Sequence, residues 1–251
     1  MLFSILVFGL SFWNVAQVQE PQPEEYETLY YKVEKIFIPV GFDDNDDVEV
    51  IVSGQFPNDC WKVEEVEKTR TKAGYSLKMK ARKWKAFCAD KMSPFWKKVS
   101  LGYLKVGNYI ITNEEKNEGT LIVRGAKFKT EDDYQYASVD SVKTRYEFNK
   151  ETGRIEKRFL VLKGEFPNAC YQLAKNPPVD LIRESSEGLI EILPVIEYNK
   201  ALSQNCSTPI EFEEPIAIPE NLSGKFMIYL RTDSDKLENS IAKLIHIQSM
   251  N

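Results

Sequence analysis

The sequence has a single histidine, His246, and four cysteines, none of which stand in a C-x-x-C pair. Zinc sites need clustered cysteine and histidine ligands, so this composition excludes the common zinc-binding domains. The motifs G-x-S-x-G and H-E-x-x-H are absent, as is a phosphate-binding glycine loop. His246 stands between Ile245 and Ile247, with no serine or cysteine motif to act with it. We therefore expect no catalytic site, no cofactor and no metal ion.

The chain also lacks any apolar run long enough to cross a bilayer as a helix. Residues 1–13 are apolar apart from two serines, a length typical of the core of a signal peptide. Residues 17–27 are acidic and carry prolines, so they cannot pack into a core. We predict a signal peptide over residues 1–16 and an acidic linker over residues 17–29, and hence a periplasmic or extracellular protein. The alternative is a buried N-terminal segment.

Helical patterns are few, and the dominant feature is a repeat. Residues 54–61 read Gly-Gln-Phe-Pro-Asn-Asp-Cys-Trp, and residues 164–171, which lie 110 positions later, read Gly-Glu-Phe-Pro-Asn-Ala-Cys-Tyr. This offset is about one domain length and indicates a duplicated module. Further matches follow at an offset of 117, so a loop has gained seven residues in the later copy. At this offset, Val99, Leu101, Gly107, Tyr109 and Ile111 of the first copy correspond to Ile216, Ile218, Gly224, Phe226 and Ile228 of the second.

The spacing of apolar residues predicts strands rather than helices. Residues 75–81 alternate apolar and polar side chains, as a half-buried strand does. Many short strands at even spacing, with turn residues between them, favour an all-β protein made of two β-sandwiches. We place the first sandwich at residues 30–125, a linker at residues 126–137 and the second sandwich at residues 138–251.

Four cysteines admit three pairings, and the repeat selects one bond for each module. We predict disulfides between Cys60 and Cys88 and between Cys170 and Cys206. Each bond should stabilise its module by roughly 3 to 4 kcal/mol. The alternative is four free thiols in a reducing cytosol.

The repeated string G-x-F-P-N-x-C-[WY] is followed by a second cysteine about thirty residues on and then by G-x-[YF]-x-[VI]. This pattern resembles the immunoglobulin-like β-sandwich module of secreted and lipid-anchored proteins of Gram-negative bacteria. The resemblance covers nearly the whole mature chain, twice, and implies two tandem immunoglobulin-like domains with one disulfide each. It says little about activity. Tyr109 resembles the tyrosine corner of such sandwiches, whose hydroxyl bonds nearby backbone, whereas Phe226 has no hydroxyl.

Residues 78–98 hold eight cations against one acid, Asp90, with aromatic side chains interleaved. Cations and aromatics together can hold an anionic partner by Coulomb attraction and stacking. The residues that we predict to bind such a ligand are Lys80, Arg82, Lys83, Trp84, Lys85 and Trp96. The alternative is a solvated outer strand face with both tryptophans packed on the sandwich. The net charge of −5 argues against nucleic acid as the partner.

Two further patterns have structural interpretations. Asp43, Asn45 and Asp47 alternate as at the start of a calcium loop, but Val48 and Gly54 replace the required glycine and glutamate. We interpret this stretch as a turn, with a weak calcium site as the alternative. The Phe-Pro-Asn string recurs in both copies, which favours a turn that aims the cysteine inward over a ligand-binding loop.

Taken together, the sequence predicts a secreted, non-catalytic binding protein that contacts an anionic envelope component through its first module. The alternative is a protein-docking or inhibitor module that uses sandwich loops or an edge strand. An enzyme ranks third, because the sequence offers no catalytic motif.

Overall fold

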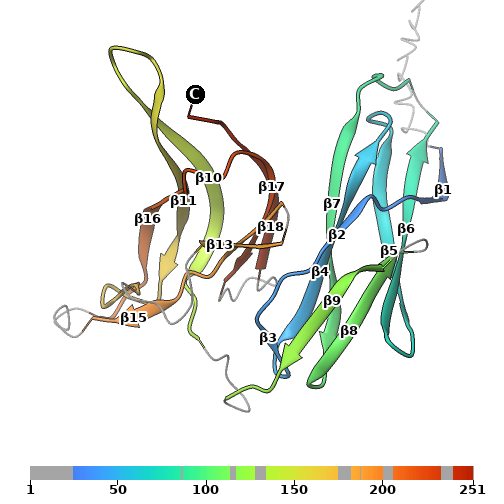
Figure 1. Cartoon of the computed structure of the whole chain (residues 1–251), viewed down its shortest axis with the longest axis horizontal. Coiled ribbons are helices and arrows are strands. Elements are labelled where there is room, and N and C mark those ends of the chain that lie inside the picture. The colour runs from blue at the N-terminus through green and yellow to red at the C-terminus, as the bar shows by residue number, and fades with distance from the viewer. Residues whose placement is uncertain are drawn as a thin grey trace, which may run out of the picture.

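The structure, a computed structural model, describes residues 25–85, 87–113, 117–127, 134–174, 182–186, 188–199, 206–232 and 240–250. Every regular element in this part of the chain is a β-strand, which confirms the all-β prediction (Figure 1). The same part contains no helix long and apolar enough to span a membrane. The predicted signal peptide at residues 1–16, the linker residues 17–24 and the linker residues 128–133 lie outside the described residues.

The first half, residues 25–127, forms two sheets packed face to face. One is the three-stranded sheet β2-β4-β7, and the other holds β5, β6, β8, β9 and β3 with β1 at its side. The strands are β1 (Tyr26–Tyr31), β2 (Lys35–Phe37), β3 (Phe42–Asp43), β4 (Asp47–Phe56), β5 (Trp61–Arg70), β6 (Gly74–Trp84), β7 (Ser93–Tyr103), β8 (Gly107–Asn113) and β9 (Asn117–Arg124). Strand β6 pairs with β5 along one edge, while β1 and parallel β8 share its other edge.

The second half, residues 134–250, repeats this plan. Its three-stranded sheet is β10-β11-β16, its mixed sheet is β13-β14-β17-β18, and β12 pairs with β15 beside them. The strands are β10 (Ser138–Phe148), β11 (Ile155–Phe166), β12 (Tyr171–Leu173), β13 (Ile182–Ser186), β14 (Leu189–Ile192), β15 (Ile196–Tyr198), β16 (Ile210–Ala217), β17 (Gly224–Arg231) and β18 (Ser240–Ile247). The parallel pair β14-β17 corresponds to β6-β8 in the first half.

The repeated motif is the same piece of architecture in both halves. Gly54 lies opposite Phe95 in the first half, and Gly164 lies opposite Phe212 in the second. A Cβ atom on Gly54 would come within 2.6 Å of the Phe95 ring, so glycine is required for this close approach. The ring of Phe56 then stacks on Phe95 with centroids 4.4 Å apart.

The turn within the motif aims each first cysteine at its partner. The Asn58 side chain accepts a hydrogen bond from Cys60 N at 3.1 Å, and Asn168 does the same for Cys170 N at 2.9 Å. This side-chain turn supports the structural interpretation of the Phe-Pro-Asn string. The predicted bonds Cys60–Cys88 and Cys170–Cys206 are both formed, which confirms the pairing.

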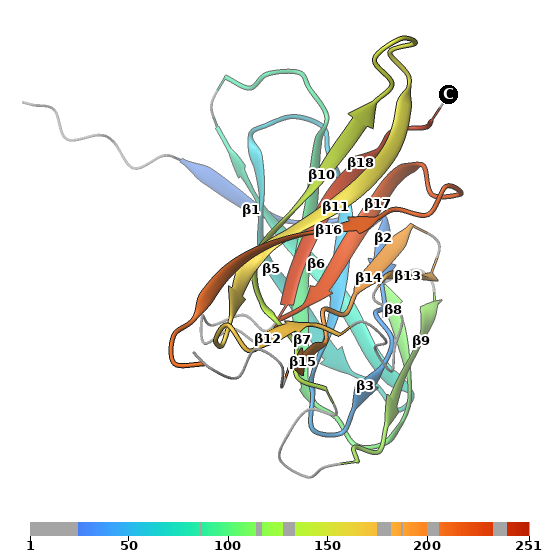
Figure 2. The ribbon, with the colours of Figure 1, turned by 90° about the vertical axis from the view of Figure 1, so that its left-hand side faces the viewer.

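The two halves pack against each other through a sheet that is buried on both faces. Phe226, Ile228 and Leu230 of β17 point into the core of the second half. Met227 and Tyr229, which alternate with them, belong to the same buried cluster as the core of the first half. The molecule is therefore a stack of four sheets, seen edge-on in Figure 1, with β10, β11 and β16 outermost and nearest the viewer in Figure 2.

Candidate binding surface

Strand β6 presents three of the predicted ligand-binding residues on one face. Met79 and Ala81 are buried in the core, so the alternating Lys80, Arg82 and Trp84 project outward. Lys83 lies between Arg82 and Trp84 and points to the other face, where it lies over the Trp61 ring, and Lys85 follows the end of the strand. The structure thus gathers five of the six predicted residues along β6 and just beyond it.

Acidic side chains from the neighbouring strand β5 meet the cations in the middle of β6. Arg82 Nη2 lies 2.8 Å from Glu64 Oε1, and its Nε donates to the same oxygen at 3.0 Å. Lys80 forms an ion pair with Glu67. Hydrogen bonds from Arg82 and then from Thr28 lower the pKa of the Glu64 carboxyl. These two cations are therefore part of a cross-strand network that compensates their charge.

The cations at the end of β6 pair with acids from the start of the described chain. Lys83 Nζ lies 3.3 Å from Glu27, and Lys85 Nζ donates to Glu25 at 2.6 Å. The hydrogen bond to Glu25 raises the pKa of Lys85. Both pairs are open to water, with Lys85 54% and Glu25 75% exposed, and exposed pairs contribute little to stability.

Trp96 lies apart from the other five residues. It stands on β7, in the other sheet, and its indole Nε1 donates to the Ala242 carbonyl of the second half at 3.1 Å. Trp84 instead faces outward beside Tyr26, with ring centroids 6.1 Å apart. The two tryptophans therefore occupy opposite outer faces of the first half.

Phe87 is a surface feature that the sequence did not single out. Its side chain is fully exposed at 103%, and Met92 in the same β6–β7 loop is 55% exposed. The next residue, Cys88, is tied to the buried Cys60. A large apolar residue directly before a disulfide cysteine, in a short stretch that also holds Lys85, Asp90 and Lys91, is the sequence signal that could have marked it.

The carboxylates of the acidic turn between β3 and β4 form hydrogen bonds and an ion pair with other parts of the protein. Asp43 accepts a hydrogen bond from Asn45 N at 3.1 Å, and Asp46 pairs with Arg231 of the second half at 3.3 Å. Asp47 accepts from the Ser100 hydroxyl at 2.6 Å. Each of these carboxylates thus has a protein partner, as the turn interpretation expects.

In the described residues, one group of side chains has the spacing of metal ligands: Asp59 with Cys60 and Cys88. The two sulfurs are joined in a disulfide and so are not thiolate ligands. A small pocket of about 120 Å³ lies where β6 changes partner from β1 to β8. Pockets that bind small molecules usually have a volume of about 300 Å³ or more. The volume of this pocket is closer to that of a single side chain.

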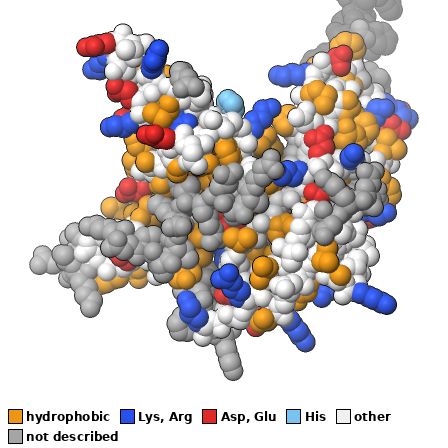
Figure 3. Space-filling model, in the orientation of Figure 1, with side chains coloured by type: hydrophobic (Ala, Val, Ile, Leu, Met, Phe, Trp, Pro, Cys, Tyr) orange, Lys and Arg blue, Asp and Glu red, His pale blue; other side chains and the backbone are white. Residues whose placement is uncertain are grey.

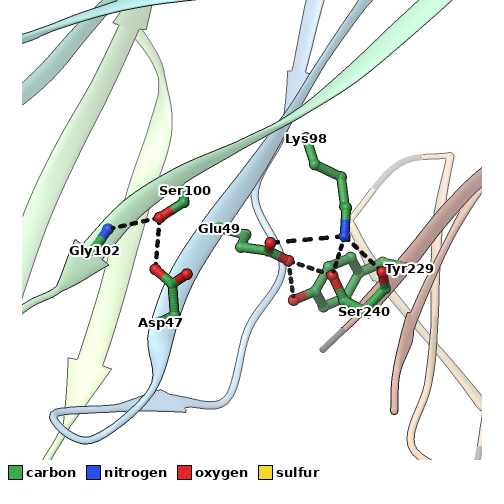
Figure 4. Close-up of polar contacts among 7 residues, drawn as sticks. All are labelled: Asp47, Glu49, Lys98, Ser100, Gly102, Tyr229 and Ser240. Carbon is green, nitrogen blue, oxygen red and sulfur yellow. Dashed lines mark hydrogen bonds and ion pairs between the residues drawn. The ribbon is translucent and has the colours of Figure 1, made fainter. Parts of the chain in front are cut away.

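Lys98, at the end of the basic stretch, joins the two halves. Its Nζ donates to the Ser240 carbonyl at 2.6 Å and lies 3.7 Å from Glu49 (Figure 4). The Tyr229 hydroxyl donates to Glu49 at 3.2 Å. Burial, with the nearby Glu49 charge adding to it, raises the pKa of Tyr229 well above its ordinary value. This network closes the interface between β4, β7, β17 and β18.

Fold and surface together define a disulfide-stabilised all-β protein of two β-sandwich halves, an architecture compatible with a non-catalytic binding module. Residues 50–123, from within β4 to the penultimate residue of β9, match the family model of the ORF11 beta-sandwich domain. This similarity agrees with the sandwich seen in the first half. No curated protein and no solved structure matches the chain.

Proposed function

We propose that the protein is a secreted, non-catalytic binding protein that contacts an anionic component of the cell envelope. The contact surface is the basic–aromatic end of the first half, which comprises Lys83, Trp84, Lys85, Phe87, Lys91 and Met92. The observation that carries the proposal is the full exposure of Phe87 directly before Cys88, which a disulfide ties to Cys60. Met92 of the same loop is exposed as well, and exposed apolar side chains that gather in one place mark interaction sites.

Several bonds anchor the described residues of this loop. The Cys60–Cys88 disulfide anchors its centre. Lys85 N donates to the Glu25 carbonyl at 2.9 Å, and Ala89 N donates to the Asp59 carboxylate at 2.9 Å. A loop that is already ordered loses little conformational entropy on binding. The basic–aromatic end is therefore pre-organised for binding.

The exposed ion pairs at this end allow an anionic partner to compete. Glu25 and Glu27 lie in water beside Lys85 and Lys83, so replacing them by another anion costs little free energy. Arg82 is held by two hydrogen bonds to Glu64, so it stays within the sheet network. The proposal therefore assigns ligand contact to Lys83, Lys85 and Lys91 rather than to Lys80 and Arg82.

Charge reversal tests this function. The triple variant Lys83→Glu, Lys85→Glu and Lys91→Glu should lose salt-sensitive binding to anionic probes, measured on a sulfated glycan resin and on anionic vesicles. The matched control reverses Lys150, Arg154 and Lys157 on the β10–β11 hairpin, which changes the net charge equally. Retained binding in the first variant, or equal loss in both, would contradict the proposal. Wild-type binding should also weaken at about 0.5 M salt, where the Debye length is roughly 4 Å.

A second candidate is docking of another protein on a strand edge. Within the described residues β16 pairs with β11 on one side, and its residue Ile210 is 46% exposed. Such an edge can accept an extra strand from a partner. A complex that resists high salt and is lost when Glu211→Pro blocks the edge would favour this function.

A further inference from the structure

We infer that the anionic component is the surface of a lipid bilayer, and that Phe87 enters its interfacial layer while the neighbouring lysines contact the headgroups. This inference rests on the proposed function and specifies its partner. It is drawn from the full exposure of Phe87, from the order of the neighbouring side chains and from the place where the chain enters the described structure.

The shape of the basic–aromatic end matches a flat or soft partner. Phe87 has its whole side chain in water, so it projects from the protein and does not line a hollow. Small ligands are usually held in concave pockets that bury most of their surface. A bilayer can bury a projecting ring without any cavity in the protein, because the lipid supplies the apolar surroundings.

The residue types around Phe87 are those found at membrane interfaces. Trp84 and Met92 flank the loop, and Lys85 and Lys91 stand between them and Phe87 in the sequence. Aromatic rings are enriched at the level of the headgroups, and lysines close to an anionic leaflet are attracted to it. The apolar and cationic contributions add, and a stable membrane contact generally needs two such signals.

The chain enters the described structure beside the same loop. The Glu25 carbonyl accepts the hydrogen bond from Lys85 N, so residue 25 is fixed next to the basic–aromatic end. Eleven residues separate Glu25 from the apolar run at residues 1–13. An extended chain of that length spans at most about 40 Å. A membrane that holds the apolar run during export is therefore within reach of Phe87.

Co-sedimentation of the whole chain with vesicles tests the inference. The vesicles contain phosphatidylcholine alone or with about one third phosphatidylglycerol. Phe87→Ser should lower the partition coefficient for the anionic vesicles about 10- to 100-fold, the expected effect of one phenyl ring. Phe87→Trp should restore binding, because tryptophan also favours the interface. The control Phe148→Ser, at the exposed tip of the β10–β11 hairpin, should leave binding unchanged.

The outcomes separate this inference from the function on which it rests. Unchanged partitioning of Phe87→Ser, or an equal loss with Phe148→Ser, overturns the bilayer contact. Binding to the sulfated glycan without binding to vesicles also overturns it, while the proposed anion-binding function stands. Binding to neither probe contradicts both. Circular dichroism and the mass of the oxidised chain establish that each variant is folded with its disulfides formed.

Discussion

The two halves share one strand topology but use the outer face of the mixed sheet in opposite ways. In the first half this face is charged and open to water, with Lys80 and Arg82 paired to acids of β5. In the second half the same face carries Met227 and Tyr229, and it is buried against the first half. Ile110 and Met227 occupy equivalent positions, yet Ile110 is 36% exposed and Met227 is fully buried. A duplicated fold has thus diverged in its surfaces.

The three-stranded sheets differ in the reverse sense. Ile51 of β4 is fully buried under the second half. Its equivalent, Val161 of β11, is also buried at 5%, but Lys163, two residues further along the same strand, pairs with Glu213 and both side chains are 48% exposed. Charged side chains also gather at the β10–β11 hairpin of this sheet (Figure 3). The contact between the halves joins the three-stranded sheet of the first half to the mixed sheet of the second. Because these two surfaces differ, a contact of this type can add further sandwiches one after another. Exposed charges on the last sheet, such as those of Lys163 and Glu213, oppose such repetition.

The largest effect that we predict concerns a buried arginine that only the second half possesses. Arg158 donates four hydrogen bonds to backbone carbonyls, those of Pro219, Glu220, Leu222 and Gln248. Its equivalent in the first half is the buried Val48. Arg158→Ala should lower the free energy of unfolding by roughly 3 to 5 kcal/mol, because buried carbonyls lose a charged donor. Urea denaturation measures this, and a loss no greater than that of Val48→Ala would contradict it.

The two disulfides should have nearly equal effects on stability but different effects on binding. Their sequence separations are 28 and 36 residues, so each should contribute about 3 to 4 kcal/mol by restricting the unfolded chain. Replacing Cys60 and Cys88 by serine also frees the Phe87 loop and should weaken anionic binding. Replacing Cys170 and Cys206 should leave binding intact in the folded protein. Thermal melts and vesicle binding are the measurements, and equal binding by both variants would argue against the loop.

A matched pair of substitutions tests whether equivalent faces are used differently. Met227→Thr should destabilise the protein by roughly 2 to 4 kcal/mol, because it leaves a cavity and a hydroxyl between the halves. Ile110→Thr, on the exposed equivalent face, should change stability by less than about 1 kcal/mol. Urea denaturation of both variants compares them, and similar losses would show that the faces do not differ.

The smallest predicted effect appears at alkaline pH. Tyr229 has a raised pKa in the folded protein, so its phenol stays protonated while that of the unfolded chain ionises above about pH 10. The stability that it contributes is present below that pH and falls as pH rises, by up to about 1.4 kcal/mol per pH unit. Tyr229→Phe should make the alkaline loss of stability shallower. Tyr103→Phe, at a 75% exposed site, should leave the slope unchanged.

Local architecture could be predicted from the sequence because its causes are local. The repeat predicted the turn at Asn58 and both disulfides, since each motif contains the glycine, proline and asparagine that its geometry needs. The tyrosine corner is confirmed, because the Tyr109 hydroxyl donates to the Lys105 carbonyl at 2.7 Å. Such features depend on neighbours within a few residues, and these are visible in the chain.

The contact between the halves could not be predicted in the same way, because its partners are distant in sequence. Glu49 meets Tyr229 and Ser240 across about 180 residues. One signal was present: residues 226–230 read Phe-Met-Ile-Tyr-Leu, an unbroken apolar run typical of a strand buried on both faces. The acids that pair with Lys80, Arg82, Lys83 and Lys85 come from other strands, and the spacing of the cations contains no information about them.

The central claim is that the two halves unfold as one cooperative unit. Urea unfolding followed by two spectroscopic probes tests this claim most directly. Trp61, Trp84 and Trp96 lie in the first half, and the second half has no tryptophan. Because Trp96 contacts Ala242 of the second half, the measurement uses a Trp96→Phe background, in which fluorescence reports the first half. Far-ultraviolet circular dichroism reports both. The account predicts one transition with the same urea midpoint by both probes, and a split transition once Met227→Glu places a charge in the interface. Two midpoints in the unmodified protein, with a dichroism step that fluorescence lacks, would contradict it.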